Sequence, residues 1–502
     1  MVINTRKWWV LLGTGLCLAL SFLDQTAVIV IMPTVQKSLG ATTLQMEWVI
    51  NAYMLVMAVL FVLGGRLGDL YGEKKIYLAG IFIFLFASIL CGISSSVEML
   101  VIARAIQGVG SALLIPAQSV IILNAFPVQE RGRAMGLNLA IASVFMVIGG
   151  FVGGIIVEYF NWQTVFWINV PLSLISAGLV IWAVLPDTKK GILRHLDWVG
   201  LFWQLMSVTT LIIAIMELGH IAWEWCVALV IISALSFYIL FKVEMTKKNP
   251  LFSFHIFKIK AFTTSSIMIF LLQIILVVGI FTTIFYQDVL GVSPATAGLM
   301  SLPGTLPILL MGPIGGWLLD RYGVRLPLLL GLGLNVFAYV WIASVFHLRD
   351  YWLFVPALIA SGIGTPLIFT CIFTPALSAV ELHNRGVASG TLGVLRQIGS
   401  SLGLAIASAI INLTNTWSIK SQLVGSGLNT DPNVVASVFS SPKILNMFSL
   451  SDQGAVIDIA KNALTVSINF AMLWAAIIVI FAWMIAFIRM RNNPGFLPKD
   501  RP

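Results

Sequence analysis

The chain has 502 residues, of which 59% are hydrophobic and 10% charged, and its formal net charge is +9. A soluble chain carries about 25% charged residues, so most of this chain is expected to lie in lipid. The positive charges are scattered over short segments, which argues against nucleic-acid binding. The four cysteines all fall inside apolar runs, and the sequence indicates neither a disulfide framework nor a metal site.

Apolar runs long enough to cross a bilayer as helices follow one another along the chain, since a span needs about 20 apolar residues. The run after the basic segment 1–7 is too long for a signal-peptide core, so we interpret it as a retained span. Barrel strands would be half as long and of alternating polarity, so the sequence predicts an all-α polytopic membrane protein. The fourteen predicted spans are 8–32, 46–65, 76–94, 98–123, 134–157, 164–185, 197–217, 224–243, 261–285, 296–318, 326–346, 352–376, 386–411 and 465–488.

Lysine and arginine indicate the orientation of the spans, because cytoplasmic loops of membrane proteins are enriched in these residues. With the N-terminus in the cytoplasm, 22 of the 29 lysines and arginines fall in cytoplasmic segments and five fall outside. The remaining two, Arg104 and Arg396, lie within spans. The opposite orientation would place the excess outside, so both termini are predicted to be cytoplasmic.

Two short polar turns, at 65–75 and 316–325, repeat the pattern Gly-x-Leu-x-Asp-x-Tyr-Gly followed by cations. A second pattern, Arg-Gly-x-Ala-x-Gly, opens the fifth span at 131–136 and the thirteenth at 385–390. Spans 1–6 therefore match spans 9–14, and spans 7 and 8 form an inserted hairpin, which is a 6+2+6 layout. Parallel repeats of this kind place a binding site between the two halves near the midplane.

The repeat divides the chain into three predicted parts. These are an N-terminal six-helix bundle (1–190), the hairpin with a cytoplasmic linker (191–260), and a C-terminal six-helix bundle (261–502) with an external loop at 412–464. The sequence contains no Walker loop and no nucleophile elbow, so neither ATP-driven transport nor a membrane enzyme is indicated.

With these features the sequence resembles the major facilitator superfamily, and within it the fourteen-span drug:proton antiporters of the EmrB/QacA type. The resemblance covers nearly the whole chain and rests on seven motifs in the expected order. They are Leu23-Asp24-Gln-Thr-Ala-Val to Pro33, Glu47-Trp48-Val-Ile-Asn51-Ala-Tyr53, the turn at 65–75, Arg104-Ala-Ile-Gln107-Gly108-Val-Gly110, Trp162 to Pro171, Asn249-Pro250-Leu251 to Phe257-Lys258, and Leu395-Arg396-Gln397-Ile-Gly399.

Asp24 is a carboxylate inside the first span, where a charged group is costly and is expected to face a cavity or a partner. By helical rise, Asp24 and Arg104 both lie roughly 10 Å below the outer surface, so the two can pair. The pair is either a permanent structural lock or a site where a proton or a cationic substrate competes with Arg104 for Asp24. The resemblance implies a functional acid at Asp24 and links Arg104 to proton coupling.

The repeated turns are candidates for a gate. Their aspartates lie in tight turns where the glycines at 72 and 323 permit the backbone conformation, and the adjacent cations also serve as positive-inside anchors. As a gate, an aspartate at a neighbouring helix N-terminus or arginine would stabilise one conformer and release in the other. The first turn departs from the family pattern at Leu70 and Glu73, where basic residues are common. The predicted gating residues are Gly65, Asp69, Gly72, Lys74, Asp320, Arg321, Gly323 and Arg325.

Four glycines, Gly149, Gly150, Gly153 and Gly154, place small residues four apart on the fifth span, a pattern typical of close helix packing. The resemblance identifies this helix as the one that carries the antiporter motif, although the motif usually has a proline where this chain has Gly150.

Arg396 and Gln397 lie roughly 16 Å from the cytoplasmic end of the thirteenth span by helical rise. A charge at this depth must be compensated, either by substrate in a cavity or by an internal ion pair. The predicted substrate cavity combines Arg396 and Gln397 with Asp24 and Gln107. Because the tenth span has no interior carboxylate, poor handling of divalent organic cations is expected.

The resemblance implies a proton-coupled antiporter that exports amphipathic drugs or toxic small molecules by alternating access, without a cofactor. It places the protein in the lipid bilayer of the bacterial cytoplasmic (inner) membrane, where family members act alone or dock to a periplasmic adaptor protein. The alternatives are a dedicated carrier of a siderophore, a metabolite or another anionic compound, an importer, and a non-transporting sensor or assembly factor. Intramembrane charges argue against the last of these.

Overall fold

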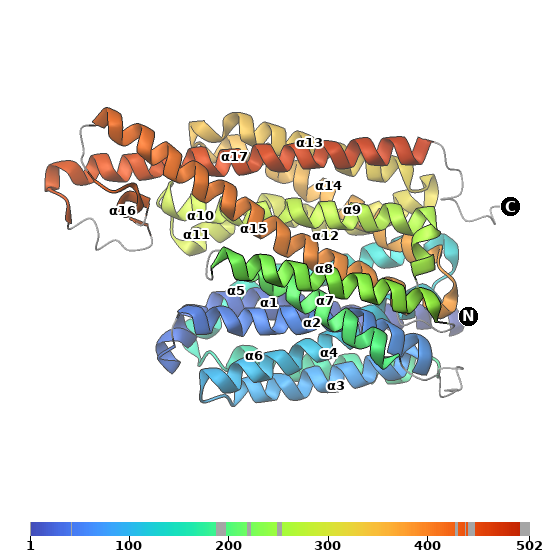
Figure 1. Ribbon diagram of the computed structural model, residues 1–502. Helices are drawn as coiled ribbons and strands as arrows, with labels where there is room; N and C mark the ends of the chain where they lie inside the picture. Colours follow the sequence, from blue (N-terminus) through green and yellow to red (C-terminus); the bar gives the residue numbers. More distant parts are fainter. Residues whose placement is uncertain are drawn as a thin grey trace.

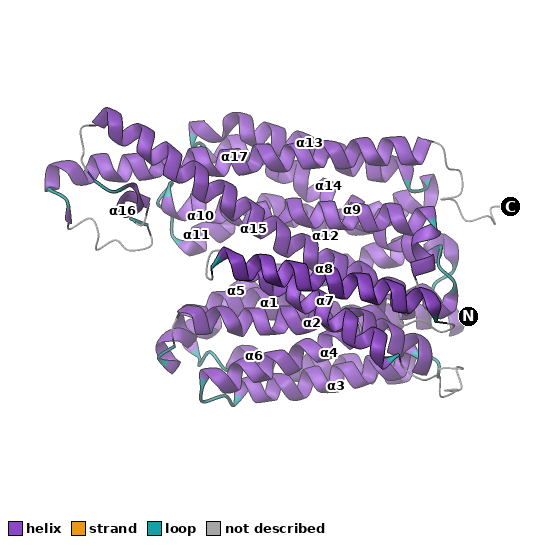
Figure 2. Cartoon of the chain, viewed as in Figure 1, coloured by secondary structure: helices purple, strands orange, loops and turns teal. Residues whose placement is uncertain are grey.

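The structure is a computed structural model of the chain. It describes residues 2–41, 43–186, 197–217, 222–247, 254–426, 430–436, 438–439 and 447–491. Helices and short connections make up these described residues, and no strand occurs among them (Figure 2). The predicted all-α class is therefore confirmed.

Thirteen helices within the described residues are long and apolar enough to cross a membrane, and they coincide with thirteen of the fourteen predicted spans. The fifth predicted span coincides with α5 (Arg131–Tyr159), a helix of 29 residues that is not among the thirteen. α5 packs against α1 (Val2–Leu39) on one side and α12 (Leu302–Tyr322) on the other, inside the bundle.

The N-terminal half is a bundle of the six helices α1 to α6, which are drawn in blue to cyan in Figure 1. α4 packs against both α2 and α3, α1 packs against α5 and α6, and α3 also packs against α6. The helices that complete this half are α2 (Thr43–Tyr71), α3 (Glu73–Gly92), α4 (Val97–Ala125) and α6 (Thr164–Ala183).

The C-terminal half repeats these pairings with its own helices. α14 packs against α12 and α13, α15 packs against α9, and α13 packs against α17, so each contact has its counterpart in the first half. The helices are α9 (Lys260–Leu276), α10 (Ile280–Asp288), α11 (Pro294–Met300), α13 (Arg325–Val345), α14 (Tyr351–Ser378), α15 (Arg385–Ser426), α16 (Pro432–Ala436) and α17 (Leu450–Arg491).

Two predicted spans of this half are interrupted. The ninth changes to a 3₁₀ turn at Val277–Gly279 between α9 and α10. The tenth breaks at Ser301 between α11 and α12, where a proline occupies the first turn of α12. Proline lacks the N–H that a continuous helix needs, and it is tolerated at the start of a new one.

The inserted hairpin consists of α7 (Trp198–Met216) and α8 (Trp223–Thr246), and α7 contacts α2 and α15, one helix from each half (Figure 1, green). Asp197 caps α7 by accepting the N–H of Gly200 at 2.8 Å, and it also pairs with Lys247 at the end of α8. Burial alone would raise the pKa of Asp197, but the Gly200 N–H and Lys247 hold that pKa below its usual value. These contacts pin the two ends of the hairpin together.

The stretch 412–464, which we predicted to be a loop, is helical over much of its length. α15 continues to Ser426 and α17 begins at Leu450, so both helices extend well beyond the predicted ends of their spans. With α16 they form a cap at the end of the bundle opposite the N-terminus (Figure 1). Its own apolar core supports the extended helices, since packing of an apolar face supplies most helical stability. That core comprises Ile419, Leu423, Val435, Val438, Val456, Ile459, Ala460 and Ala463.

The two halves meet through α2 with α15 and through α5 with α12. Both interfaces use glycines where the backbones touch. A Cβ on Gly65 would overlap the carbonyl oxygen of Gly386, and a Cβ on Gly316 would overlap that of Gly132. Only glycine permits such an approach.

Candidate functional site

Asp24 and Arg104 form an ion pair inside the N-terminal half. Asp24 is 0% exposed on α1 and Arg104 is 1% exposed on α4. Arg104 Nη1 donates to Asp24 Oδ2 at 2.5 Å, so the pairing suggested by their equal depth is present. The Arg104 guanidinium also lies over the ring of Tyr53 at 4.5 Å and donates from Nε to the carbonyl oxygen of Val49 at 3.2 Å.

Two amides complete the surroundings of the Asp24 carboxylate. Gln107 Nε2 and Asn169 Nδ2 donate to Asp24 Oδ1 at 3.2 and 3.1 Å. The same two groups donate to Ser88 Oγ, at 3.0 and 3.4 Å, so α1, α3, α4 and α6 are joined at one point. We call Asp24, Ser88, Arg104, Gln107 and Asn169 the buried charge network.

This network surrounds the Asp24 carboxylate with hydrogen-bond donors. The carboxylate accepts three hydrogen bonds, one of them charge-assisted through the Arg104 guanidinium. Arginine stays protonated in proteins, so a proton arriving at Asp24 would cancel the pair and leave Arg104 without its counter-ion. Breaking a buried pair by removing one partner costs about 3–5 kcal/mol, enough to change which conformer is preferred.

The glycines of α5 lie directly behind this turn of α1. A Cβ on Gly149 would overlap Thr26 and lie 3.0 Å from the carbonyl oxygen of Leu23, and one on Gly153 would lie 3.1 Å from Ala27. Gly150 and Gly154 belong to α5, but their surroundings lie outside what the structure describes. Gly149 and Gly153 thus hold α5 against the residues that flank Asp24.

A cavity of about 480 Å³ lies between the two halves. Its walls come from α1, α2, α4 and α5 of the first half and from α9, α12, α14 and α15 of the second. The volume falls within the range of small-molecule sites, about 300–1,000 Å³. Arg396 and Gln397 both line it, as we expected for a substrate cavity.

Asp24 and Gln107, the other two residues predicted for the cavity, do not line it. On α1 the lining residues are Leu18, Phe22 and Gln25, which fall on one face at helical spacing. At 3.6 residues per turn, Asp24 projects roughly 100° or more away from that face, toward the interior of the first half. Charge network and cavity are therefore separate sites on opposite sides of α1.

Asp69 and Asp320 join the two halves at the end of the bundle that carries the N-terminus. Asp69 accepts the N–H groups of Gly386 and Val387, both at 2.9 Å, at the start of α15. Asp320 accepts those of Gly132 and Arg133, at 2.9 and 2.8 Å, at the start of α5. Unpaired N–H groups and the helix dipole make a helix N-terminus a site for a carboxylate. We call these two contacts the aspartate clips.

Of the other predicted gate residues, Gly65 lies at the interface between the halves, and those below make contacts within their own halves. Gly72 and Gly323 have φ values of 104° and 77°, the left-handed region that favours glycine, so they form the turns as expected. Lys74 donates to the carbonyl oxygens of Ile181 and Val184 at the end of α6. Arg321 lies over the rings of Trp317 and Tyr322, and Arg325 over that of Phe487.

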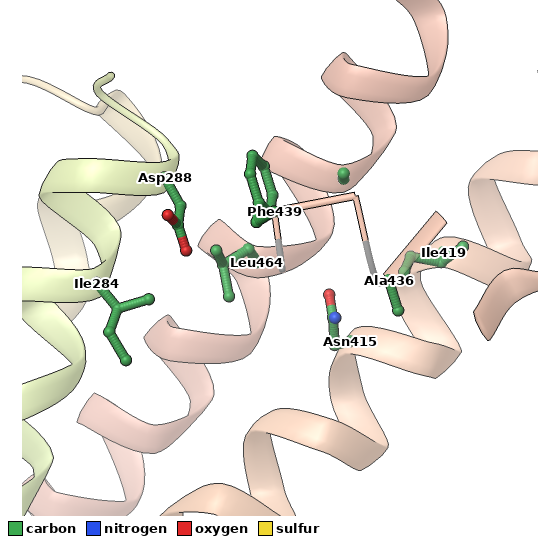
Figure 3. Close-up of a pocket in the computed structure, with 8 residues that line it drawn as sticks. Ile284, Asp288, Asn415, Ile419, Ala436, Phe439 and Leu464 are labelled. Atoms are coloured by element: carbon green, nitrogen blue, oxygen red, sulfur yellow. The ribbon is translucent and has the colours of Figure 1, made fainter. Parts of the chain in front are cut away.

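A second cavity of about 270 Å³ lies under the cap. Figure 3 shows Asp288 of α10 and Asn415 of α15 among its lining residues, with Leu464 of α17 and Phe439. Asp288, in the last turn of α10, is thus partly covered by the cap. The cap encloses polar groups beside the C-terminal end of α10.

Comparisons with known proteins identify the architecture. Residues 14–404 match the Major Facilitator Superfamily. The chain belongs to this superfamily. It is 31% identical to the multidrug resistance protein Stp of Mycobacterium tuberculosis (CDC 1551) over 81% of this chain and 76% of that one. It is 29% identical to multidrug resistance protein 3 of Bacillus subtilis, over 94% and 93% of the two chains.

A solved major facilitator structure agrees with this fold. The human organic anion transporter MFSD10 (TETRAN) aligns with a TM-score of 0.61, covering 94% of this chain and 99% of that one. At 12% identity this likeness shows the fold alone. The chain is thus a multi-pass membrane transporter of the major facilitator superfamily and not an enzyme. Its bacterial relatives are consistent with the inner membrane.

Several residues of this transporter's sites were not predicted from the sequence. Asn169 and Ser88 contact Asp24 or its amide partners, but both belong to residue types that are common in buried helices. Asn169 had one signal, an amide in an apolar span within the motif from Trp162 to Pro171. No signal in the sequence identified the residues at the start of α15 as partners of Asp69, since they lie more than 300 residues away along the chain.

Proposed function

We propose that this transporter is a proton-coupled antiporter that exports amphipathic drugs or other toxic small molecules. The observation that carries the proposal is the buried Asp24–Arg104 pair, which is separate from the central cavity. Intramembrane ionisable residues mark proton relays or substrate pathways, and this pair does not line the substrate pathway. The multidrug resistance relatives favour efflux as the direction of transport.

α5 is the element that would connect proton binding to the opening of the cavity. Gly149 and Gly153 hold it against the turn that carries Asp24, and Gly132 at its other end belongs to an aspartate clip. The two points are about 26 Å apart along the helix. Between them α5 contributes Met135, Asn138 and Ser143 to the cavity wall. A shift of α1 on protonation of Asp24 would thus reach both the cavity and the clip.

These contacts support the following transport cycle. With both clips made, the halves are joined at the end that carries the N-terminus, so we assign this conformer as closed to the cytoplasm. A proton entering from outside neutralises Asp24 and releases Arg104, which weakens the attachment of α1 to α4. Substrate leaves outward, the clips open, and proton release inside resets the pair.

The proposal includes the membrane layout predicted from the sequence. α5 and the thirteen apolar helices make fourteen spans, arranged as 6+2+6 with both termini cytoplasmic. The domains are 1–190, 191–260 and 261–502, and the cap faces outward. The proton gradient drives transport without a cofactor. A periplasmic adaptor would meet the protein on the cap side.

Export from proteoliposomes under an imposed pH gradient tests this function. We expect efflux of a fluorescent amphiphile by the wild-type protein to follow the gradient and to stop when a protonophore collapses it. Asp24→Asn should show neither response, although it should still bind the amphiphile, because Asp24 does not line the cavity. Gradient-driven export by Asp24→Asn would refute the assignment of Asp24 as the proton site.

A further inference from the structure

The central cavity contains a single charged side chain among its described lining residues, and that charge is positive. Of the 24 residues that line the cavity, Arg396 alone is ionisable under physiological conditions. It makes no hydrogen bond or ion pair with any side chain that the structure describes. A charge held in the membrane without a partner is costly and indicates a functional site. The cavity therefore has an uncompensated cation in its wall.

Asp24, the buried carboxylate of α1, is already engaged elsewhere. Both oxygens of Asp24 accept hydrogen bonds, from Arg104, Gln107 and Asn169, and the side chain is 0% exposed. Asp24 can neither neutralise Arg396 nor attract a cationic ligand into the cavity. The electrostatic complement of this cavity is an anion.

The rest of the wall suits an aromatic body. Four methionines line the cavity, and sulfur makes favourable contacts at ring edges. Phe369 and Phe373 stack on α14 with ring centroids 6.3 Å apart, offering a flat apolar surface. The four methionines are Met54, Met57, Met135 and Met146.

A second polar anchor lies on the wall contributed by the first half. Gln118 Nε2 donates to Asn138 Oδ1 at 2.7 Å, which fixes the orientation of the Gln118 amide. Its Oε1 is buried and has no hydrogen-bond partner among the described residues. A buried acceptor of this kind calls for a donor. Gln118 would accept a hydroxyl or N–H group of the ligand, while Arg396 holds its anionic group from the other half.

We propose that the central cavity selects aromatic amphiphiles that carry one anionic group, with Arg396 as the counter-ion. The inference rests on the proposed function only in taking this cavity as the substrate site. Arg396 on α15 and Gln118 on α4 belong to different halves, so such a ligand would bridge the two bundles. The same charge would repel organic cations, which the wall offers no carboxylate to bind.

A matched ligand series tests the proposal by direct binding. Pyrenebutyrate, pyrenebutanamide and pyrenebutylamine share one aromatic body and carry a negative, neutral or positive head at pH 7. Their binding to purified protein in zwitterionic nanodiscs is followed by energy transfer from tryptophan to pyrene, with empty nanodiscs correcting for partition into lipid. Wild-type protein should bind the butyrate at least about tenfold more tightly than the amine, as a charge-assisted contact requires.

Variants of Arg396 separate its charge from its shape. Arg396→Gln should bring the affinities for the butyrate and the amine to within about twofold of one another, and Arg396→Glu should reverse their order. Arg396→Lys should keep the preference for the anion. Arg489→Gln, which removes a cation at the exposed end of α17, should bind the series like the wild type. Size-exclusion profiles and thermal melts show which variants are folded.

Two outcomes would overturn the proposal. The first is a wild-type protein that binds the amine as tightly as the butyrate, and the second is a folded Arg396→Gln that keeps the preference for the anion. Other results distinguish a failure of the proposed function from a failure of this inference. If the preference depends on Arg396 but a pH gradient drives no export of the butyrate, the cavity chemistry stands and proton coupling does not. If the wild-type protein binds the amine as tightly as the butyrate and the gradient drives export of the amine, the anion preference is wrong and the antiporter stands.

Discussion

The two halves of the molecule are alike where they close and unlike where they carry buried charge. Asp69 of the first half and Asp320 of the second make the same pair of hydrogen bonds to the start of a helix in the opposite half. The glycine four residues before each aspartate touches the partner backbone in both cases. The same aspartate and glycine contacts therefore occur twice at this end of the bundle, once from each half.

Among the residues that the structure describes, the buried charge network has no counterpart in the second half. Gly80 and Gly110 bring α3 and α4 together, and Gly331 and Gly364 do the same for α13 and α14. Counted back from Gly110 and Gly364, the position of Arg104 matches Leu358 and that of Gln107 matches Ser361.

Neutral groups occupy the matching region of the second half. Asn335 donates to the carbonyl oxygen of Gly331 at 3.0 Å and accepts from Ser361 at 3.2 Å and Thr365 at 3.4 Å. All three of these hydrogen bonds join Asn335 to neutral groups. The two halves thus share the aspartate clips and differ in the buried charge network, to which the proposed function assigns proton coupling.

The largest effect is expected when Arg104 is replaced by leucine, the residue type at the matching position of the second half. Arg104→Leu leaves Asp24 buried with a charge and no counter-ion, which should lower the free energy of unfolding by about 3–5 kcal/mol. Thermal unfolding in detergent measures the change. Adding Asp24→Asn to Arg104→Leu should restore part of the stability by removing the orphaned charge. Leu358→Met, a volume-conserving control in the other half, should cost less than about 1.5 kcal/mol.

Replacing the interface glycine of either half by valine should impair transport to the same extent. Gly65→Val and Gly316→Val each place side-chain atoms where the partner backbone lies, so the halves should not close at this end. We expect transport to fall to the level of protein-free liposomes, while distances between spin labels on the two halves lengthen at this end. Gly178→Val, at a site with open space around it, should transport normally. Loss of transport in one glycine variant alone would contradict equivalent roles for the two glycine contacts.

A milder change is expected from the aspartates of the clips. Asp69→Asn and Asp320→Asn each replace charge-assisted hydrogen bonds by neutral ones, and each should shift the equilibrium toward the open conformer by about 1.5–3 kcal/mol. Spin-label distance distributions report the populations, and the two variants should shift them by similar amounts. Asp350→Asn, which alters the cap of α14 instead, should leave the distribution unchanged.

The smallest effect is expected at Asn335. Asn335→Ala removes the acceptor shared by Ser361 and Thr365, which should lower the free energy of unfolding by about 1 kcal/mol. The ratio of protons to substrate moved should stay that of the wild type, because this group carries no charge. A changed ratio would show that the second half also takes part in proton coupling.

Much of this architecture could be predicted from the sequence, because hydropathy and repeated turns are local patterns. The depth of Asp24 and Arg104 along their helices correctly suggested that they pair. Depth does not give the direction of a side chain, so the sequence placed Asp24 in the cavity that it faces away from. The clips join segments distant in sequence, and no local pattern in the turn at 65–75 identifies its partner.

The helices of the cap are a second feature that the sequence did not predict. Residues 412–426 and 450–464 are polar enough to suggest a loop, and composition alone offered no reason to expect helices there. The helices form because Ile419 and Leu423 of α15 pack against Val456 and Ile459 of α17. That support is tertiary, and it depends on which segments meet once the two spans are in place.

The measurement that tests proton coupling through Asp24 most directly is proton exchange with solvent on substrate binding. Purified protein in weakly buffered detergent solution is brought to a series of starting pH values, and a pH-indicating dye reports the protons released when a saturating amphiphile is added. Wild-type protein and Asn335→Ala should release protons in equal amounts, and Asp24→Asn should release none while still binding the amphiphile. Undiminished proton release by a folded, ligand-binding Asp24→Asn would contradict the assignment of proton coupling to the buried charge network.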